Sequence, residues 1–104
     1  MAMLAPAIEQ RLKQFIAAAQ QQQPISAAYV YGSQVKGTAT EWSDIDVAII
    51  SPDFAADLFQ ARVALLRLAA QIDVRIEPHP FTPEDFTINH PLVHEIRQTG
   101  IRLV

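Results

Sequence analysis

Two aspartates stand two residues apart at the start of an apolar run, in the segment YGSQVKGTATEWSDIDVAII (residues 31–50). Side chains two positions apart on a strand point to the same face, so Asp44 and Asp46 are expected to project together. Carboxylates this close repel each other unless a cation lies between them. Oxygen ligands suit Mg²⁺ or Mn²⁺ rather than zinc. Taken alone, however, an Asp-x-Asp pair is usually two acids that face water.

A glycine–serine pair that precedes the aspartates strengthens the case for a site. Gly32 lets the backbone approach a ligand closely, and free N–H groups at such a turn bind phosphate oxygens. The Ser33 hydroxyl adds a further donor, and a helical turn over residues 34–37 would add the positive end of its dipole. Followed by a metal-binding strand, this turn predicts a two-part site for a nucleoside triphosphate.

These residues resemble a known family. Gly-Ser, ten intervening residues and Asp-Ile-Asp match the GSx10DxD signature of the polymerase-β-like nucleotidyltransferases. Gly37 within the spacer and Ser43 just before the acids make the pattern similar to that of the minimal nucleotidyltransferases (MNT), which are small bacterial and archaeal proteins. The resemblance covers residues 29–104 and implies the polymerase-β-like nucleotidyltransferase fold, with Gly32, Ser33 and Ser43 at the nucleotide.

The family pattern includes a third carboxylate on a neighbouring strand, and two residues are candidates for it. Asp73, Arg75 and Glu77 alternate with apolar residues, so they would share one face of a strand. Glu77 precedes the loop HPFTPEDF, as the family's third acid does, although a glutamate replaces the usual aspartate. We therefore prefer Glu77, while Asp73 stays an alternative that could instead form a surface ion pair with Arg75. The expected catalytic metal ligands are Asp44, Asp46 and Glu77.

The resemblance also implies a reaction. Three acids can hold two Mg²⁺ ions, one activating the attacking oxygen and one binding the triphosphate. MNT antitoxins of this type transfer AMP from ATP to a tyrosine of a HEPN-domain toxin, a ribonuclease, and so silence it. The expected function is thus a protein adenylyltransferase acting as an antitoxin. Two alternatives stay open, which are a non-catalytic antitoxin that neutralises its toxin by binding alone, and nucleotidyl transfer to a small molecule or RNA.

Periodicity predicts the elements that position these residues. Apolar residues at steps of three and four indicate a helix over residues 4–22, and a second helix is expected from a cap at Ser51 or Asp53 to about residue 70. A short helix is expected over residues 92–98, with Gly100 as its C-cap. Strands are expected over residues 25–31, 44–50, 71–77 and 101–104. The order predicts an α/β (α+β) fold with a small mixed β-sheet flanked by helices, in a single domain over residues 1–104.

Composition limits the function classes. The 104 residues suit one domain, and a net charge of −3 argues against a general nucleic-acid binder, so no direct nucleic-acid contact is expected. Cysteine is absent, which excludes disulfides and thiolate metal sites and fits a cytoplasmic protein. No apolar run is long enough for a membrane span. The chain is too short for a separate acceptor-binding domain, so we expect the acceptor surface to come from a partner protein or another copy.

Five further residues carry weaker expectations. Lys36 follows the glycine–serine turn and is interpreted as a solvated lysine rather than a phosphate ligand. Trp42 is expected to pack against its loop rather than to stack on a base. His79 and the other two histidines have no ligand spacing among themselves, so they are assigned no metal.

Overall fold

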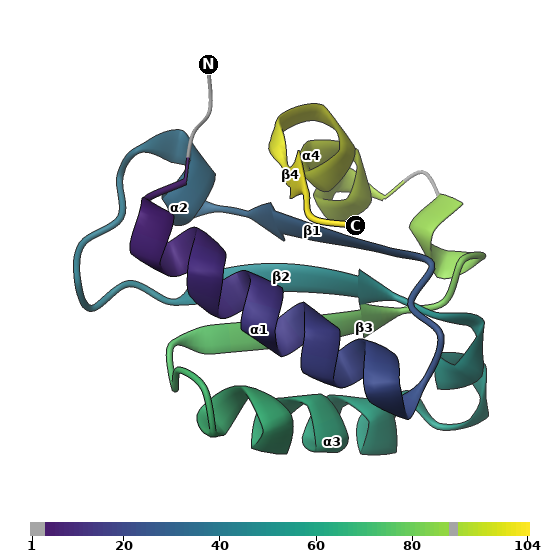
Figure 1. Cartoon of the computed structure of the whole chain (residues 1–104). Helices are drawn as coiled ribbons and strands as arrows, with labels where there is room; N and C mark the ends of the chain where they lie inside the picture. Colours follow the sequence, from purple (N-terminus) through teal and green to yellow (C-terminus); the bar gives the residue numbers. More distant parts are fainter. Residues whose placement is uncertain (1–3, 88–89) are drawn as a thin grey trace.

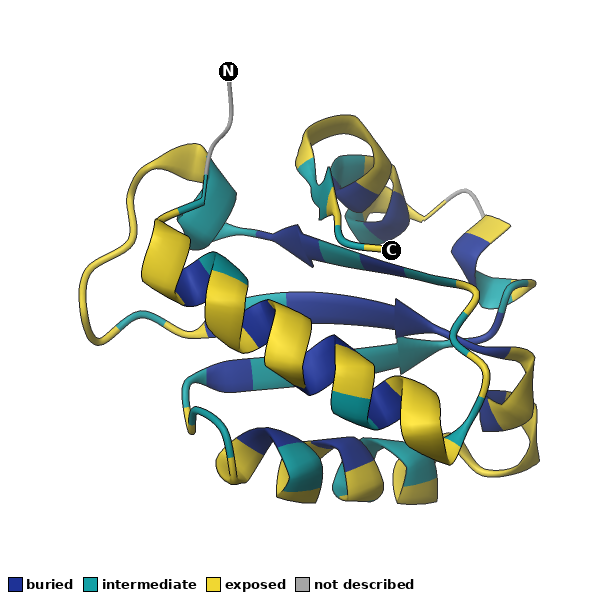
Figure 2. Ribbon diagram, in the orientation of Figure 1, coloured by how far each residue is buried: buried dark blue, intermediate teal, exposed yellow. Residues whose placement is uncertain are grey.

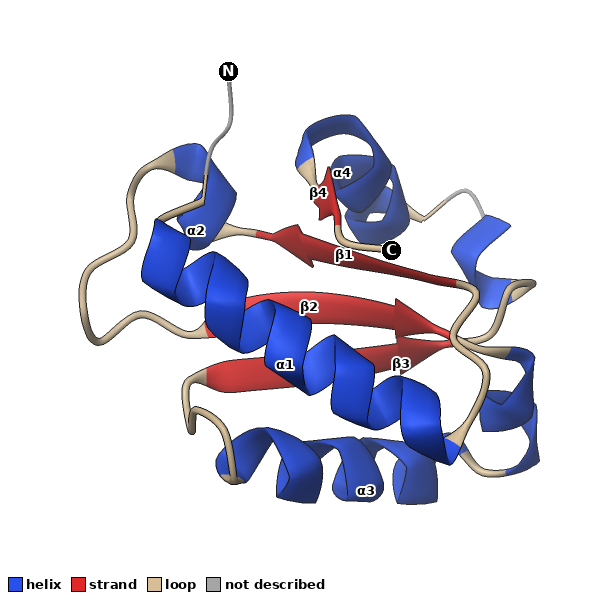
Figure 3. Cartoon of the chain, in the orientation of Figure 1, coloured by secondary structure: helices blue, strands red, loops and turns tan. Residues whose placement is uncertain are grey.

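The computed structural model describes residues 4–87 and 90–104, and its helices and strands alternate along the chain (Figure 1 and Figure 3). The helices are α1 (Pro6–Gln22), α2 (Ser33–Lys36), α3 (Leu58–Ala70) and α4 (Pro91–Thr99), with 3₁₀ helices η1 (Pro52–Ala56) and η2 (Asp85–Thr87). The strands are β1 (Ala27–Tyr31), β2 (Ile45–Ile50), β3 (Ile76–Phe81) and β4 (Ile101–Arg102). This arrangement confirms the predicted α/β (α+β) class. Within the described ranges, no helix combines the length and apolar character needed to cross a membrane.

The four strands form one mixed sheet in the order β3-β2-β1-β4. β1 pairs antiparallel with both β2 and β4, whereas β2 and β3 are parallel and are connected through η1 and α3. The parallel pair matters most for function, because it places the strand that contains Asp46 beside the strand that contains Glu77. The predicted adjacency of these two strands is therefore confirmed.

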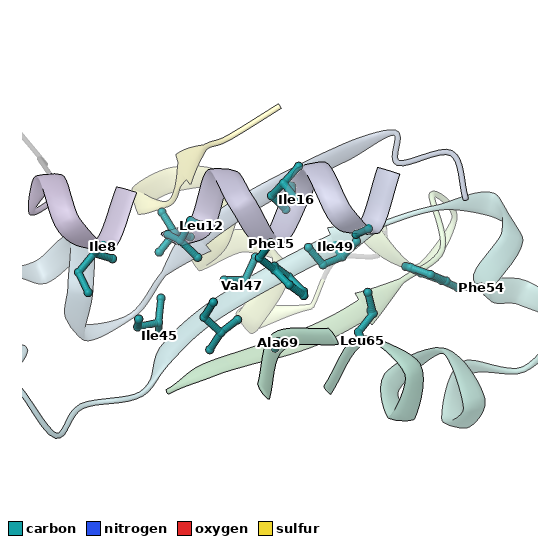
Figure 4. Close-up of a cluster of buried hydrophobic side chains, with 14 residues drawn as sticks. Ile8, Leu12, Phe15, Ile16, Ile45, Val47, Ile49, Phe54, Leu65 and Ala69 are labelled. Atoms are coloured by element: carbon teal, nitrogen blue, oxygen red, sulfur yellow. The ribbon is translucent and has the colours of Figure 1, made fainter. Parts of the chain in front are cut away.

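One face of the sheet packs against α1 and α3. The buried residues of α1 recur at helical spacing and meet side chains of β2 and α3 between the helices and the sheet (Figure 2 and Figure 4). The α1 residues in this core are Ile8, Leu12, Phe15, Ile16 and Ala19. From β2 it receives Ile45, Val47 and Ile49, as the alternation in the sequence predicts. Full burial of each aliphatic side chain contributes about 1.5–3 kcal/mol, so this layer fixes the position of β2.

The opposite face of the sheet is covered by α4 and η2. Val93 and Ile96 of α4 pack with Phe86 against β1 and β2, where Ala48 and Ile50 are buried. β2 is therefore buried on both faces over its second half. Asp46, which shares a face with Ala48 and Ile50, lies nearer the start of the strand and is only partly buried. The apolar cover thus ends where the acidic residues begin.

The third strand begins five residues later than the sequence pattern suggested. Residues 71–77 were expected to be extended, but β3 spans Ile76–Phe81. Residues 71–75 instead form the turn after α3, which is held by a hydrogen bond from the Arg75 amide to the Asp73 carboxylate (2.9 Å). A side chain that hydrogen-bonds to nearby backbone stabilises a turn in competition with a strand. The Asp73 carboxylate does so here, and residues 71–75 form a turn.

Two prolines explain why β3 was expected to be a loop. Pro78 and Pro80 lie inside the strand, and proline cannot donate a hydrogen bond to a neighbouring strand. β3 is an edge strand, however, and the Ser51 amide donates to the carbonyl of Phe81 (3.0 Å). Backbone groups alternate in direction along a strand, so the N–H and C=O groups of the odd-numbered residues of β3 point toward β2. The backbone nitrogens of Pro78 and Pro80 therefore point away from the sheet. Their missing N–H groups therefore cost no sheet hydrogen bond.

The helix expected from residue 51 or 53 to about residue 70 is divided in two. Ser51 does act as a cap, since its hydroxyl accepts from the Asp53 amide (3.2 Å), but it caps only η1. Asp57 has an extended backbone and starts α3 separately, accepting a hydrogen bond from the Gln60 amide (3.0 Å). At the other end of the chain, Gly100 forms the C-cap of α4 as predicted.

Candidate active site

Three side chains form a row across the sheet. In the register of the strands, Tyr31 of β1 is opposite Asp46 of β2, and Asp46 is opposite Glu77 of β3. Directly paired residues point to the same face, and neighbouring strands are about 4.8 Å apart. Folding therefore brings the Asp46 and Glu77 carboxylates side by side, beyond the edge of the apolar cover.

Asp44 joins this pair from the residue before β2. A hydrogen bond with the Asp44 side chain is the main factor that raises the pKa of Glu77, followed by partial burial and the negative charges of Asp44 and Asp46. The backbone of Asp44 is tied to α2 through its carbonyl, which accepts from the Gln34 side chain (3.3 Å). The three carboxylates therefore repel one another, and a bound metal ion would relieve that repulsion.

A histidine and an arginine approach the acids from other elements. His79 Nε2 lies 3.6 Å from Asp46 Oδ1, and Arg62 Nη2 lies 3.6 Å from Glu77 Oε1. Both distances exceed hydrogen-bond length, and the histidine pairs as an ion only when it is protonated. Sequence reasoning missed both residues. The alternation of β3 would have placed His79 beside Glu77, had the strand been located correctly, whereas no sequence signal identifies Arg62.

Gly32 is required by the close approach of Asp46. Its φ of 79° and ψ of −145° belong to a region that other residues rarely adopt, and a Cβ atom there would lie 2.8 Å from Asp46 Oδ2. The Gly32 carbonyl accepts from the amides of Val35 and Lys36, which starts α2 at Ser33. The glycine–serine turn, the short helix and the acids therefore lie together, as the spacing predicted.

Ser43 has a visible role in its own loop. Its hydroxyl accepts a hydrogen bond from the Thr40 amide (2.8 Å), and its amide donates to the Thr40 carbonyl (3.1 Å). These bonds close a turn directly before Asp44. Ser43 thus helps to position the first acid, and its expected contact with a nucleotide stays a prediction.

Asp73 is not part of the acid row, the name used here for Asp44, Asp46 and Glu77, because it forms ion pairs of its own. Its carboxylate accepts from Arg75 Nε (3.1 Å) and Nη2 (2.8 Å), and Arg11 Nε lies 3.3 Å away. The hydrogen bonds from the Arg75 side chain are the main factor that lowers the pKa of Asp73. This geometry favours Glu77 over Asp73 as the third acid, and it confirms the alternative in which Asp73 forms an ion pair with Arg75, here partly buried.

Comparison with known proteins places this arrangement in a family. A model of the nucleotidyltransferase domain matches residues 12–97, a range that contains both Gly32 and Glu77. The chain belongs to the nucleotidyltransferase domain family. Nucleotidyltransferases of this kind generally use a divalent metal and a nucleoside triphosphate.

A solved structure supports the fold of this nucleotidyltransferase domain. A candidate nucleotidyltransferase from Sulfolobus solfataricus, determined at 1.40 Å, superimposes with a TM-score of 0.57 at 14% sequence identity. The match covers 98% of this chain and 89% of that one. No curated protein matches the chain.

The acids of the nucleotidyltransferase domain suit a hard divalent cation in chemical type. Asp44, Asp46 and Glu77 offer only carboxylate oxygens, as Mg²⁺ prefers. In the described part of the chain, however, no three acidic, histidine or cysteine side chains converge closely enough to hold a metal. Asp44 is exposed and the Glu77 side chain is 36% exposed, so both are able to rotate toward a shared ion.

One of two neighbours of the site agrees with the sequence and the other does not. The Lys36 side chain is about half exposed, as expected of a solvated lysine, and its Nζ pairs with Glu95 of α4 (2.7 Å) rather than with the acids. The expected packing of Trp42 is wrong, since the side chain is 83% exposed. Its loop is held by its own hydrogen bonds, including one from the Trp42 amide to Thr40 Oγ1 (3.3 Å), and needs no aromatic core.

Proposed function

We propose that this nucleotidyltransferase domain transfers AMP from ATP, with Mg²⁺, to a tyrosine of a HEPN ribonuclease toxin and so acts as its antitoxin. The supporting observation is the pairing of Asp46 with Glu77 across β2 and β3, with Asp44 directly before β2. This trio of carboxylates adjoins the turn that begins at Gly32. Transfer of a nucleotidyl group requires carboxylates that bind the metal and a turn that binds the phosphates.

Each residue has a defined task in the proposed reaction. Asp44, Asp46 and Glu77 would hold the metal, which when bound supplies positive charge to the triphosphate and the attacking oxygen. The Ser33 hydroxyl and the backbone amides of Ser33 and Gln34, the first two residues of α2, would bind phosphate oxygens. A bond forms between the acceptor oxygen and the α-phosphorus as the bond to pyrophosphate breaks. The hydroxyl proton of the acceptor passes to a carboxylate of the site.

Exposure of the acids supports a large acceptor. The side chains of Asp46 and Glu77 are about one third exposed, and Asp44 is exposed, so the row is open to solvent at one end of the sheet. A folded protein can present a tyrosine to such a surface without an enclosed pocket. The resemblance to the MNT antitoxins supplies the HEPN toxin as the partner and ATP as the nucleotide.

A non-catalytic antitoxin is the second candidate. Two observations favour it, namely the glutamate at the position of the usual third aspartate and the lack of convergence of the acids. In that case the same surface would bind the toxin without modifying it. Changing the acids would then leave neutralisation intact.

A labelling experiment separates these functions. The purified protein is incubated with Mg²⁺, ATP labelled at the α-phosphate and a lysate of its source cells, beside an Asp44→Asn/Asp46→Asn variant and a γ-labelled reaction. We expect a protein band that takes up only the α-label and only with the wild type. Asp53→Asn is the matched control, because Asp53 is an exposed acid of η1 outside the site.

Each other outcome has a distinct meaning. Label in RNA or in small molecules identifies the second class of acceptor. Absence of acid-dependent label, with a toxin that still co-purifies, overturns the catalytic proposal and leaves the binding antitoxin.

A further inference from the structure

Most cations around the acid row are already engaged. Lys36 pairs with Glu95 at 2.7 Å, and the Arg75 guanidinium donates two hydrogen bonds to Asp73. Arg62 differs, because its contact with Glu77 is 3.6 Å long and its side chain is 44% exposed. Among the described residues at the site, Arg62 is therefore a guanidinium held only loosely, next to a predicted metal ligand.

Arg62 reaches the acid row from outside the sheet. It belongs to α3, which begins at the cap Asp57 and packs along the edge strand β3. Its charge also acts on Tyr31, two strands away. Burial and then the charges of Asp46 and other acids raise the pKa of Tyr31, and Arg62 opposes that increase. The one contact between Arg62 and these side chains that the structure shows is with Glu77, at 3.6 Å.

We propose that Arg62 is a positioning residue that holds Glu77 in the metal-free protein and, once a divalent cation takes the carboxylate, moves to the triphosphate. This inference rests on the proposed function, because it takes the acids as the metal site. A half-exposed ion pair contributes at most about 1 kcal/mol, so a divalent ion readily displaces it. The released side chain stays beside the site, and a guanidinium binds phosphate oxygens through two parallel N–H groups.

The two roles predict effects of opposite sign. Without Arg62, a divalent ion at the acids loses a competitor and a repelling charge, so it binds more tightly. A triphosphate in the same site loses a ligand, so it binds more weakly. A residue that only supports the fold would weaken both, which makes the pair of measurements decisive.

Two binding experiments use the intact protein. Binding of Mn²⁺ is followed by the loss of the free-ion electron paramagnetic resonance signal, and binding of α,β-methylene-ATP with Mg²⁺ is followed by calorimetry. For Arg62→Ala we expect roughly fivefold tighter Mn²⁺ binding, the order of one unit charge acting on a divalent ion in water. The nucleotide analogue should bind roughly tenfold more weakly, as for loss of one charge-assisted hydrogen bond.

Two further variants serve as controls. Arg62→Lys keeps the charge but loses the paired N–H groups, so Mn²⁺ binding should stay near the wild-type value while analogue binding falls. Arg67→Ala, on the exposed side of the same helix, should change neither. Circular dichroism confirms that each variant is folded.

Two results overturn the inference in distinguishable ways. If Arg62→Ala leaves Mn²⁺ affinity unchanged or lowers it, while Asp44→Asn/Asp46→Asn abolishes binding, Arg62 has no such role and the metal site stands. If Mn²⁺ does not bind, or binds equally to the double aspartate variant, both this inference and the proposed metal site fail.

Discussion

Asp46 of β2 lies directly opposite Glu77 of β3 in the parallel register of the sheet. Their side chains share a face, and Asp44 directly before β2 adds a third carboxylate that raises the pKa of Glu77. Such a cluster is tolerated only with compensating positive charge or bound protons. In this structure the Arg62 guanidinium lies 3.6 Å from Glu77 and supplies positive charge where a metal ion could act.

Glu77→Gln should stabilise the protein at neutral pH. Because the pKa of Glu77 is raised above 4.5 in the folded state, its contribution to stability is present below pH 4.5 and is lost as pH rises through the folded value. Wild type and variant should therefore be equally stable at low pH and diverge above pH 4.5. The variant should gain at most about 1 kcal/mol, since Glu77 is partly exposed.

Urea unfolding of both proteins between about pH 4 and about pH 8 measures this difference. Glu84→Gln, an exposed control near η2, should show no such divergence. A Glu77→Gln variant that is less stable than wild type at neutral pH would mean that attraction between Glu77 and Arg62 outweighs repulsion from Asp44 and Asp46.

Asp73→Asn should have the opposite effect on stability. The pKa of Asp73 is lowered by the hydrogen bonds from Arg75, so its contribution is present above pH 3.8 and is lost as pH falls through the folded value. Because the Asp73 side chain is only 9% exposed, the variant should lose about 1.5–3 kcal/mol at neutral pH. Mn²⁺ binding should be unaffected. Loss of Mn²⁺ binding in this variant, with binding retained in Glu77→Gln, would identify Asp73 as the third metal ligand.

The sequence predicted correctly that the glycine–serine turn lies beside Asp46. Gly32, Ser33, Asp44 and Asp46 lie within one short stretch, and their placement depends on one turn and one strand start. The interpretation of Glu77 was less direct, because β3 begins only at Ile76 and its prolines were taken as loop residues. Glu77 still reaches Asp46, since the pairing of the two strands carries it there.

Contacts between distant elements were beyond sequence reasoning. Arg62 meets Glu77 because α3 packs along β3, and no local pattern encodes that distance. Trp42 shows the reverse case, in which a large apolar residue suggests burial but its loop closes through polar bonds alone. The proximity of Gly32 to Asp46 was therefore predictable, whereas the contact of Arg62 with Glu77 depends on tertiary packing.

Trp42→Ala should barely affect folding. The indole is 83% exposed, so truncation removes little buried area, and we expect a change in the free energy of unfolding below about 0.5 kcal/mol. Phe54→Ala is the contrasting control, because Phe54 is 1% exposed and its loss should cost roughly 3–5 kcal/mol. Urea denaturation measures both. Typical surface substitutions change stability by less than about 1 kcal/mol, so a larger loss for Trp42→Ala would show that the indole packs against the protein.

Gly32→Ala should disturb both folding and the acid row. The new Cβ would lie 2.8 Å from Asp46 Oδ2 on a backbone with φ of 79°, so we expect a loss of about 1–3 kcal/mol and a displaced Asp46 carboxylate. Gly37→Ala is the matched control, since its φ is 77° but nothing lies within 4 Å of the added atom. It should cost about 1–2 kcal/mol, the price of left-handed backbone alone, and should leave Mn²⁺ affinity unchanged. Urea unfolding measures the backbone strain in each variant, and Mn²⁺ titration measures damage to the acids. Equal Mn²⁺ affinity in the two variants would show that the close approach of Asp46 to Gly32 does not affect metal binding.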